Sequence, residues 1–173
     1  MDGKWSKVEY GGAHGRAVDG SGHAGREVDA VFLGTYTPRL DDKGRLFLPA
    51  KYRDRLQSGI VITRGHEKSL VIYPSDVFES LASRAMAAPS TNKRARSYTR
   101  MLLSGASDQI PDKQGRISVP PHLRQYAGLS RDITVTGVGD HLEVWDTETW
   151  NAELAAIEDD YSDQEEEVFP GLI

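Results

Sequence analysis

Short apolar runs and helical stretches alternate in a fixed order through residues 31–158. Residues 60–63 (IVIT) and 133–136 (ITVT) are β-branched runs typical of short buried strands. Each is followed by a second apolar run that ends in Tyr73 or Trp145, and then by a polar residue and a helical pattern. The order strand, tight turn, strand, short helix, strand, turn, strand, longer helix is therefore predicted twice.

An internal repeat relates the two halves. DDKGRLFLPAKYR begins at Asp41 and DKQGRISVPPHLR begins at Asp112, an offset of 71 residues. Aspartate, glycine, arginine and proline recur at equal positions, with apolar residues between them. The chain is therefore a duplicated module of roughly 50–55 residues, and because one copy has too little core to stand alone, we expect the two to share one core.

Glycine and proline predict the local structure of each copy. Gly44 and Gly115 are expected to take positive φ in a tight turn. Pro49 and Pro120 are expected to end a strand and begin a short helix. Two residues are predicted to be N-caps of the longer helices: Ser75 and Asp146.

The strongest helical stretch, PSTNKRARSYTRMLLSG, lies between the two copies. Thr91 or Asn92 can cap its start, and Gly105 can end it. Its apolar stripe consists of Tyr98, Met101 and Leu102, and its basic face of Lys93, Arg96 and Arg100. A solvated connecting helix is the first interpretation, and contact with phosphates or with a neighbouring subunit is the alternative.

Charge is segregated along the chain. The net charge is -5, but residues 32–152 carry 17 basic and 13 acidic groups, whereas residues 153–173 carry eight acidic groups and no basic ones. An acidic block of this kind is typical of a solvated tail, and the alternative is that it screens a basic surface elsewhere on the assembly.

The chain ends and the boundaries between modules predict five parts. They are a disordered N-terminal extension (1–30), a first module (31–88), a connecting helix (89–104), a second module (105–158) and an acidic disordered tail (159–173). One hypothesis for the extension is that Val31 marks a GTG start codon. The first 30 residues lack the apolar core of a signal peptide and no run reaches the roughly 18 apolar residues of a spanning helix, so a soluble cytosolic protein is expected.

The repeated turn allows two interpretations. Asp41 can accept hydrogen bonds from turn amides or pair with Arg45, which would pin the hairpin and nothing more. Six cations nevertheless lie within residues 39–55, and a second, less dense basic turn follows at residues 112–116. Two similar basic turns suit a polyanion, and an arginine held by an aspartate can present its fork to a guanine edge.

At these residues the sequence resembles the MraZ family, which is built from two SpoVT-AbrB-like modules. The resemblance spans roughly residues 31–158 and rests on FLGTYTPRLDDKGRLFLP, DKQGRISVPPHLRQYAGL and LEVWDTETW. It implies an α+β, mainly β fold: a pseudo-two-fold, swapped-hairpin AbrB-like β-barrel with flanking helices. It also implies a ring-shaped homo-oligomer.

The function implied by the resemblance is sequence-specific regulation of transcription. The expected partner is double-stranded DNA, at direct repeats in the promoter of the division and cell-wall gene cluster. Such a protein is expected in the cytoplasm, associated with the nucleoid.

The resemblance assigns DNA contact to the two DxxxR turns. Arg45 and Arg116 are expected to contact DNA, with Lys43 and Lys113 beside them. The residues expected to orient these turns are Asp41, Gly44, Asp112 and Gly115. Because Asp42 aligns with Lys113, the two turns are not expected to contribute equally.

The sequence leaves two other classes of function to consider: an enzyme and a protein-interaction module. The five histidines show no metal-ligand spacing, no GxSxG or Walker A motif is present, and there is no Cys, so no catalytic residue, metal or cofactor is expected. His66 and His141 each follow the glycine of a predicted hairpin and are interpreted as turn residues. The stronger rival is a protein-interaction role, since the resemblance implies restraint of a neighbouring ribosomal RNA methyltransferase. The candidate contacts for that partner are the acidic tail and residues 92–103.

Overall fold

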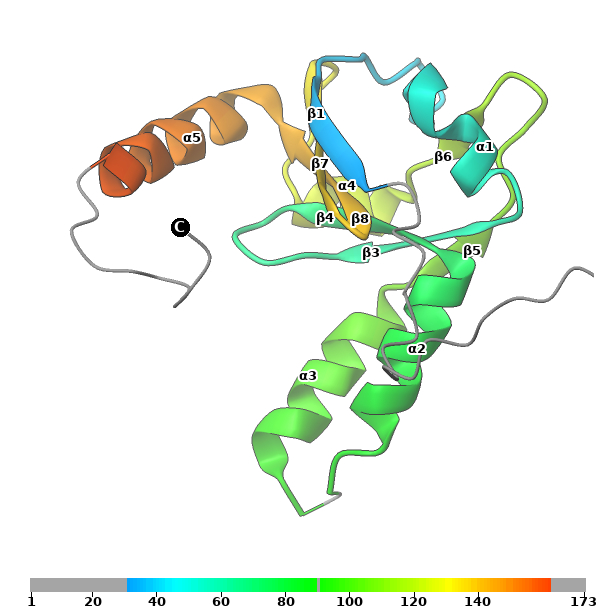
Figure 1. Ribbon diagram of the computed structural model, residues 1–173, viewed down its shortest axis with the longest axis vertical. Coiled ribbons are helices and arrows are strands. Elements are labelled where there is room, and N and C mark those ends of the chain that lie inside the picture. Colours follow the sequence, from blue (N-terminus) through cyan, green and yellow to red (C-terminus); the bar gives the residue numbers. More distant parts are fainter. Residues whose placement is uncertain (1–30, 90, 163–173) are drawn as a thin grey trace, which may run out of the picture.

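The computed structural model describes residues 31–89 and 91–162 (Figure 1). Its strands are β1 (Phe32–Tyr36), β2 (Arg45–Phe47), β3 (Ile60–Arg64), β4 (Leu70–Pro74), β5 (Ser107–Gln109), β6 (Arg116–Ser118), β7 (Ile133–Gly139) and β8 (His141–Asp146). Its helices are η1 (Ala50–Tyr52), α1 (Arg53–Leu56), α2 (Ser75–Met86), α3 (Lys93–Ser104), α4 (Pro121–Tyr126) and α5 (Thr147–Ser162). The predictions of a disordered extension and of disorder in residues 163–173 lie outside the described residues.

The strands of the described part form two antiparallel sheets. The larger sheet has the order β1-β7-β8-β4-β3-β5, and β2 and β6 form a separate two-stranded ribbon. β1 of the first half pairs with β7 of the second, and β5 of the second half pairs with β3 of the first. The two halves therefore exchange strands and fold as one unit.

The registers reveal a pseudo-two-fold axis between the halves. In the β2–β6 ribbon Leu46 lies opposite Ile117, which are the residues that the 71-residue offset aligns. In the larger sheet Val71 of β4 lies opposite Glu143 of β8, its counterpart after a one-residue slip. Equivalent residues can face one another in this way only around a two-fold axis, so the swapped-hairpin arrangement is confirmed.

The two sheets enclose one core but do not close into a barrel. β1 and β5 end the larger sheet and are not paired with each other in the described residues. Core residues come from both halves: they include Phe32, Leu46, Leu48, Leu56, Ile62, Ile72, Ile117, Leu123, Val135 and Val144. The α+β class with a strand-based core is confirmed. The closed barrel is not found, because β2 and β6 have three residues each and pair only with one another.

The local predictions for the repeat are confirmed. Gly44 and Gly115 have φ of +70° and +75°. Pro49 directly precedes η1 and Pro120 directly precedes α4. The same short motif therefore produces the same turn, strand and helix start in both halves.

Two of the predicted helix caps are found and one is wrong. Asn92 accepts the amide three residues further on (3.1 Å), and Asp146 accepts the amide two residues further on (3.1 Å). Ser75 is instead the first helical residue, because Pro74 occupies the cap position of α2 and offers no side-chain acceptor.

The last helix is longer than predicted. α5 continues to Ser162, beyond the module boundary predicted at residue 158.

α2 and α3 form a helical hairpin that projects from the larger sheet (Figure 1). A small second core lies at its base: Val61, Phe78 and Leu102. Thr63 Oγ1 donates to the carbonyl of Leu102 at 2.6 Å and ties α3 to β3. Tyr98 and Met101, predicted in the same apolar stripe as Leu102, are 46% and 50% exposed. The stripe is therefore only partly covered.

Candidate nucleic-acid interface

The first predicted turn is pinned by the carboxylate of Asp41. Its Oδ1 accepts the backbone amides of Lys43 and Arg45, both at 2.9 Å, and its Oδ2 accepts Nε of Arg45 at 2.6 Å. The amide of Gly44 donates to the carbonyl of Asp41 at 2.9 Å. The pinned hairpin expected from the motif is therefore present.

The second turn has the same geometry. Asp112 Oδ1 accepts the amides of Gln114 (2.9 Å) and Arg116 (3.0 Å), and its Oδ2 accepts Nε of Arg116 at 2.7 Å. The amide of Gly115 donates to the carbonyl of Asp112 at 2.8 Å. Agreement of these distances across the repeat indicates that the turn is a built feature of the module.

Both turn carboxylates favour the charged form. The pKa of Asp41 is lowered from 3.8, chiefly by the hydrogen bond from the Arg45 amide; burial opposes this, and the Arg45 side chain adds to the lowering. The pKa of Asp112 is lowered in the same way by Arg116. Each arginine therefore faces a charged partner at neutral pH.

This shift predicts a loss of stability in acid. As pH falls through 3.8 toward the lowered pKa values, the unfolded chain takes up protons at these two positions before the folded chain does, and folding weakens. In thermal unfolding, the gap in Tm between the native chain and an Asp41→Asn/Asp112→Asn variant should be largest above pH 5 and narrow below pH ~4. Other carboxylates titrate in both proteins, so their effects cancel in the Tm difference. A Tm difference that does not change with pH would contradict the lowered pKa values of Asp41 and Asp112.

The arginines lie at the protein surface, outside the core. The side chains of Arg45 and Arg116 are 31% and 22% exposed, and their aspartate partners are 27% and 39% exposed. Lys43 and Lys113 are exposed. Each recorded ion pair uses Nε, one of the five N–H donors of a guanidinium. Each aspartate therefore orients the guanidinium group of its arginine and leaves the side chain partly exposed.

The β2–β6 ribbon brings the two arginines to one face. Alternate residues of a strand point to opposite faces, and Leu46 and Ile117 point inward, where both are buried. The outer face therefore presents Arg45 opposite Ser118, and Phe47 opposite Arg116. The Arg116 guanidinium lies 5.7 Å from the centre of the Phe47 ring, which is 41% exposed. Two repeats distant in sequence thus form one surface.

A second pair of arginines supports the turns from the opposite half. The amide of Leu48 donates to the carbonyl of Gly115, and that of Val119 to the carbonyl of Gly44, both at 2.9 Å. A Cβ placed on Gly44 would lie 2.7 Å from Cζ of Arg124, and one on Gly115 would lie 2.5 Å from Nε of Arg53. Each turn therefore packs directly against an arginine of the other module.

This cross-module support was not predicted from the sequence. Arg53 and Arg124 align in the repeat, so a signal for a shared role was present. What the sequence could not indicate is that each of them contacts the turn of the other half, since that contact depends on the strand exchange.

The surroundings of the two turns differ in charge. Asp42 lies 3.6 Å from Arg131, and Arg39 pairs with Asp132 at 2.7 Å, beside the first turn. Lys113 takes the place of Asp42 in the second turn. Acidic residues therefore offset more of the positive charge near the first turn, and the unequal contribution of the two turns to DNA contact stays a prediction.

The two histidines singled out in the sequence lie away from the ribbon. His66 is in the loop between β3 and β4, as predicted. His141 is the first residue of β8 instead of a turn residue, and its Nδ1 lies 2.7 Å from the carboxylate of Asp140. Among residues 31–89 and 91–162, no group of three or more His, Asp or Glu side chains could hold a metal ion. In the same part of the chain, no helix is long and apolar enough to span a membrane.

The fold and the ribbon define the chain as a duplicated, strand-exchanged α+β protein with a basic surface ribbon. Two copies of a small α+β module exchange strands and present equivalent, aspartate-held arginines side by side. A family model described as "MraZ protein, putative antitoxin-like" matches residues 31–101 and again residues 102–170. The chain belongs to the MraZ family, and the two matches confirm the duplication.

Curated relatives place this family among transcriptional regulators. The chain is 54% identical over 143 residues to the transcriptional regulator MraZ of Kineococcus radiotolerans, which covers 83% of this chain and 100% of the relative. It is 52% identical over 142 residues to those of Micrococcus luteus (82% of this chain, 99% of the relative) and Salinispora arenicola (82% and 100%). The chain is accordingly a regulator of transcription.

Proposed function

We propose that the chain regulates transcription by binding double-stranded DNA through the outer face of the β2–β6 ribbon. The observation that supports this most is the pair of equivalent arginines, Arg45 and Arg116, each oriented by an aspartate on one solvent-facing surface. Lys43 and Lys113 add positive charge at the turns. We expect a protein that binds DNA in this way to lie in the cytoplasm, on the nucleoid.

Dimensions of the ribbon suit the major groove. That groove is about 12 Å wide and accepts a two-stranded β-ribbon. Arg45 lies opposite Ser118, so Arg116 is its diagonal neighbour. Diagonal neighbours are about 7–8 Å apart, close to two base-pair steps of about 3.4 Å each. Two arginines whose backbone positions have this spacing can contact guanines or phosphates of one short sequence element.

A single ribbon offers few cations, so one contact should be weak and sensitive to salt. We propose that several subunits, joined in a ring, bind successive direct repeats in the promoter of the division and cell-wall gene cluster. Linking the contacts raises the effective concentration of each ribbon at its repeat, provided that ring curvature and repeat spacing agree. Affinity would then come from the number of engaged ribbons.

Footprinting on the DNA upstream of the chain's own gene tests the proposal, with gel shifts between 50 and 200 mM salt. We expect protection of repeated short sequences. The slope of log affinity against log salt should be about −2 to −4 per engaged subunit, for two to four phosphate contacts. Arg45→Ala should lose the footprint. Protection that is unchanged by this substitution, or affinity that does not depend on salt, would exclude the ribbon as the DNA-binding surface.

The alternative function is restraint of the neighbouring ribosomal RNA methyltransferase. The same salt titration separates the two, because binding to an apolar protein surface would change little with ionic strength. In the described residues, the paired turns are a specific arrangement for binding a polyanion. We assign no arrangement in the same residues to an enzyme partner.

A further inference from the structure

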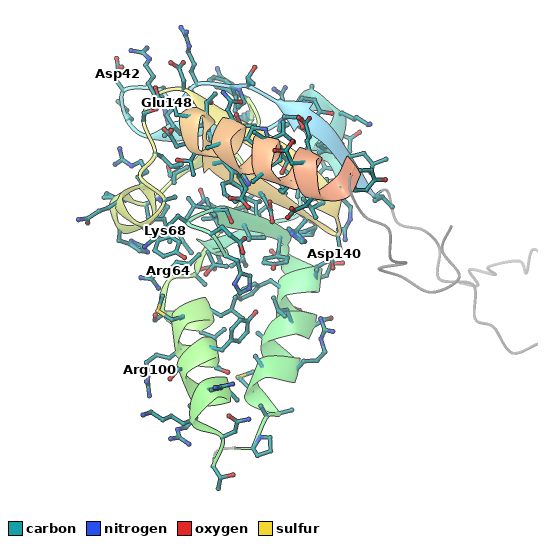
Figure 2. All side chains as sticks on the ribbon, turned by 90° about the vertical axis from the view of Figure 1, so that its left-hand side faces the viewer. Asp42, Arg64, Lys68, Arg100, Asp140 and Glu148 are labelled. Carbon is teal, nitrogen blue, oxygen red and sulfur yellow. The ribbon has the colours of Figure 1, made fainter. Side chains whose placement is uncertain are left out.

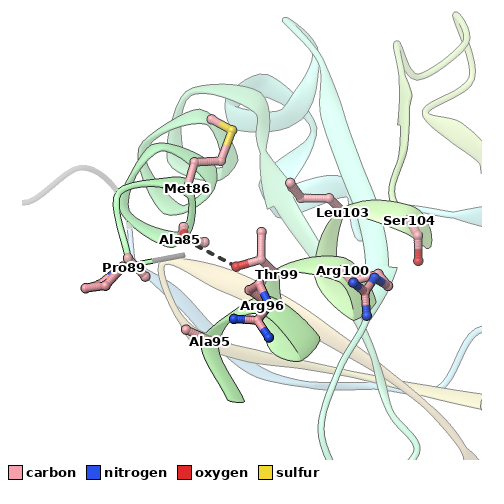
Figure 3. Close-up of a pocket in the computed structure, with 10 residues that line it drawn as sticks. Ala85, Met86, Pro89, Ala95, Arg96, Thr99, Arg100, Leu103 and Ser104 are labelled. Carbon is pink, nitrogen blue, oxygen red and sulfur yellow. Dashed lines mark hydrogen bonds between the residues drawn. The ribbon is translucent and has the colours of Figure 1, made fainter. Parts of the chain in front are cut away.

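A groove between α2 and α3 lies away from the DNA-binding ribbon. Its volume is about 550 Å³, and its apolar walls include Ala85, Met86, Pro89 and Leu103. Thr99 Oγ1 donates to the carbonyl of Ala85 at 3.2 Å and joins the two helices (Figure 3). Arg96 and Arg100 line the groove beside these apolar residues. Figure 2 shows Asp42 of the first turn near the top of the molecule and Arg100 far below it, on the projecting helical hairpin.

The charge around the groove has one sign. α3 carries four basic residues and no acidic ones: Lys93, Arg94, Arg96 and Arg100. The N-terminal end of a helix favours negative charge, so cations in the first turn of α3 are unfavourable where they stand. Met86, on the apolar wall, is 63% exposed. The groove therefore combines an uncovered apolar surface with a surplus of positive charge.

The C-terminal end of α5 has the complementary mismatch. Its last turns contain Glu158, Asp159 and Asp160 and no basic residue, although the C-terminal end of a helix favours cations. The sequence then continues as DQEEEVFPGLI, in which a block of acids directly precedes Val168 and Phe169. This segment is complementary to the groove: it carries negative charge to face the arginines and large apolar side chains to cover Met86.

We propose that the groove between α2 and α3 binds residues 163–173 of this chain, from the same subunit or an adjacent one. Phe169 would fill the apolar part, where an aromatic side chain gains most from burial. The acids of residues 165–167 would face Arg96, Arg100 and their neighbours. Pro170 restricts the backbone of Phe169 to extended conformations, which lowers the entropy lost when the segment lies along a groove.

The length of the segment sets how far it can extend from α5. The structure describes α5 to Ser162, so residues 163–173 follow it directly. Eleven residues can extend by up to about 36–40 Å. The proposal does not depend on DNA binding.

Photo-crosslinking of the full chain tests the proposal directly. A benzoylphenylalanine residue replaces Phe169, and mass spectrometry identifies the crosslinked peptides after irradiation without DNA. We expect crosslinks to residues 84–104. A crosslinked band at the mass of one chain would indicate the subunit's own segment, whereas a band at twice that mass would indicate that the segment links two subunits.

Charge reversal supplies the matched control. Arg96→Glu/Arg100→Glu should lower the yield of the crosslink to residues 84–104 about fivefold, because both changes replace attraction by repulsion. Lys51→Glu/Lys68→Glu, which also reverses two charges but at exposed lysines outside the groove, should leave it unaffected. The proposal would be overturned if Phe169 crosslinked only outside residues 84–104, for example to residues 40–47 or 111–118 or to another face of a second copy. The absence of any crosslink above background would also overturn it.

Discussion

Arg45→Ala is expected to weaken binding to a promoter fragment with several repeats by about a thousandfold, and binding to a single repeat by only about tenfold. A lost arginine contact with DNA costs about 1–3 kcal/mol, and each 1.4 kcal/mol is about a factor of ten in affinity. In a ring with three ribbons engaged, the same loss occurs three times. Gel shifts of both probes at one salt concentration measure the difference.

Two further variants control this result. Arg84→Ala removes one charge from the exposed end of α2 and should leave binding to both probes nearly unchanged. Arg45→Lys keeps the charge but loses the planar fork, so it should retain most of the salt dependence and lose discrimination between sequences. Equal losses on the single-repeat and multi-repeat probes after Arg45→Ala would contradict binding by several linked ribbons.

Gly44→Ala is expected to lower the free energy of unfolding by about 1–3 kcal/mol more than Gly128→Ala does. Both glycines have positive φ, +70° and +59°, so both substitutions incur the same left-handed strain. They differ in their surroundings: the new Cβ at Gly44 would lie 2.7 Å from Arg124, whereas nothing lies within 4 Å of one at Gly128. Arg124 belongs to the other module and packs directly on this turn, so displacing its guanidinium disturbs the contact between modules.

Urea denaturation of the two single variants measures this difference. A double-mutant cycle with Arg124→Ala isolates the contact, because removing the guanidinium should relieve most of the extra cost at Gly44. Gly44→Ala should also weaken DNA binding, since it moves the turn that presents Arg45. Equal destabilisation by Gly44→Ala and Gly128→Ala would show that the cross-module contact is unimportant for stability.

The parts of the fold that the sequence predicted correctly depend on local geometry. Gly44 and Gly115 mark a backbone that other residues adopt at a cost, and Pro49 and Pro120 have the fixed φ of a helix start. Because both sets recur at one offset, each copy supports the interpretation of the other. The DxxxR turns, which position the candidate DNA-binding residues, were found in the same way.

The predictions that failed concern the residues that surround a local pattern in the folded chain. Ser75 has the right chemistry for a cap, but the preceding proline starts the helix one residue earlier than the pattern suggested. Tyr98 and Met101 have helical spacing with Leu102, yet spacing defines a face and not what covers it. Arg53 was aligned with Arg124, but their contacts with the opposite turns became visible only in three dimensions.

By itself, the sequence determined the duplicated module, its two aspartate-held turns and the order of its strands and helices, because these follow from φ preferences and short-range hydrogen bonds. Strand exchange between the halves was implied only by the family resemblance, and only the tertiary structure decided that β2 pairs with β6. Identical local patterns allow pairing within a module as well as between modules. The choice depends on burying Leu46 and Ile117 against one another in a shared core, and that burial is what turns Arg45 and Arg116 outward together.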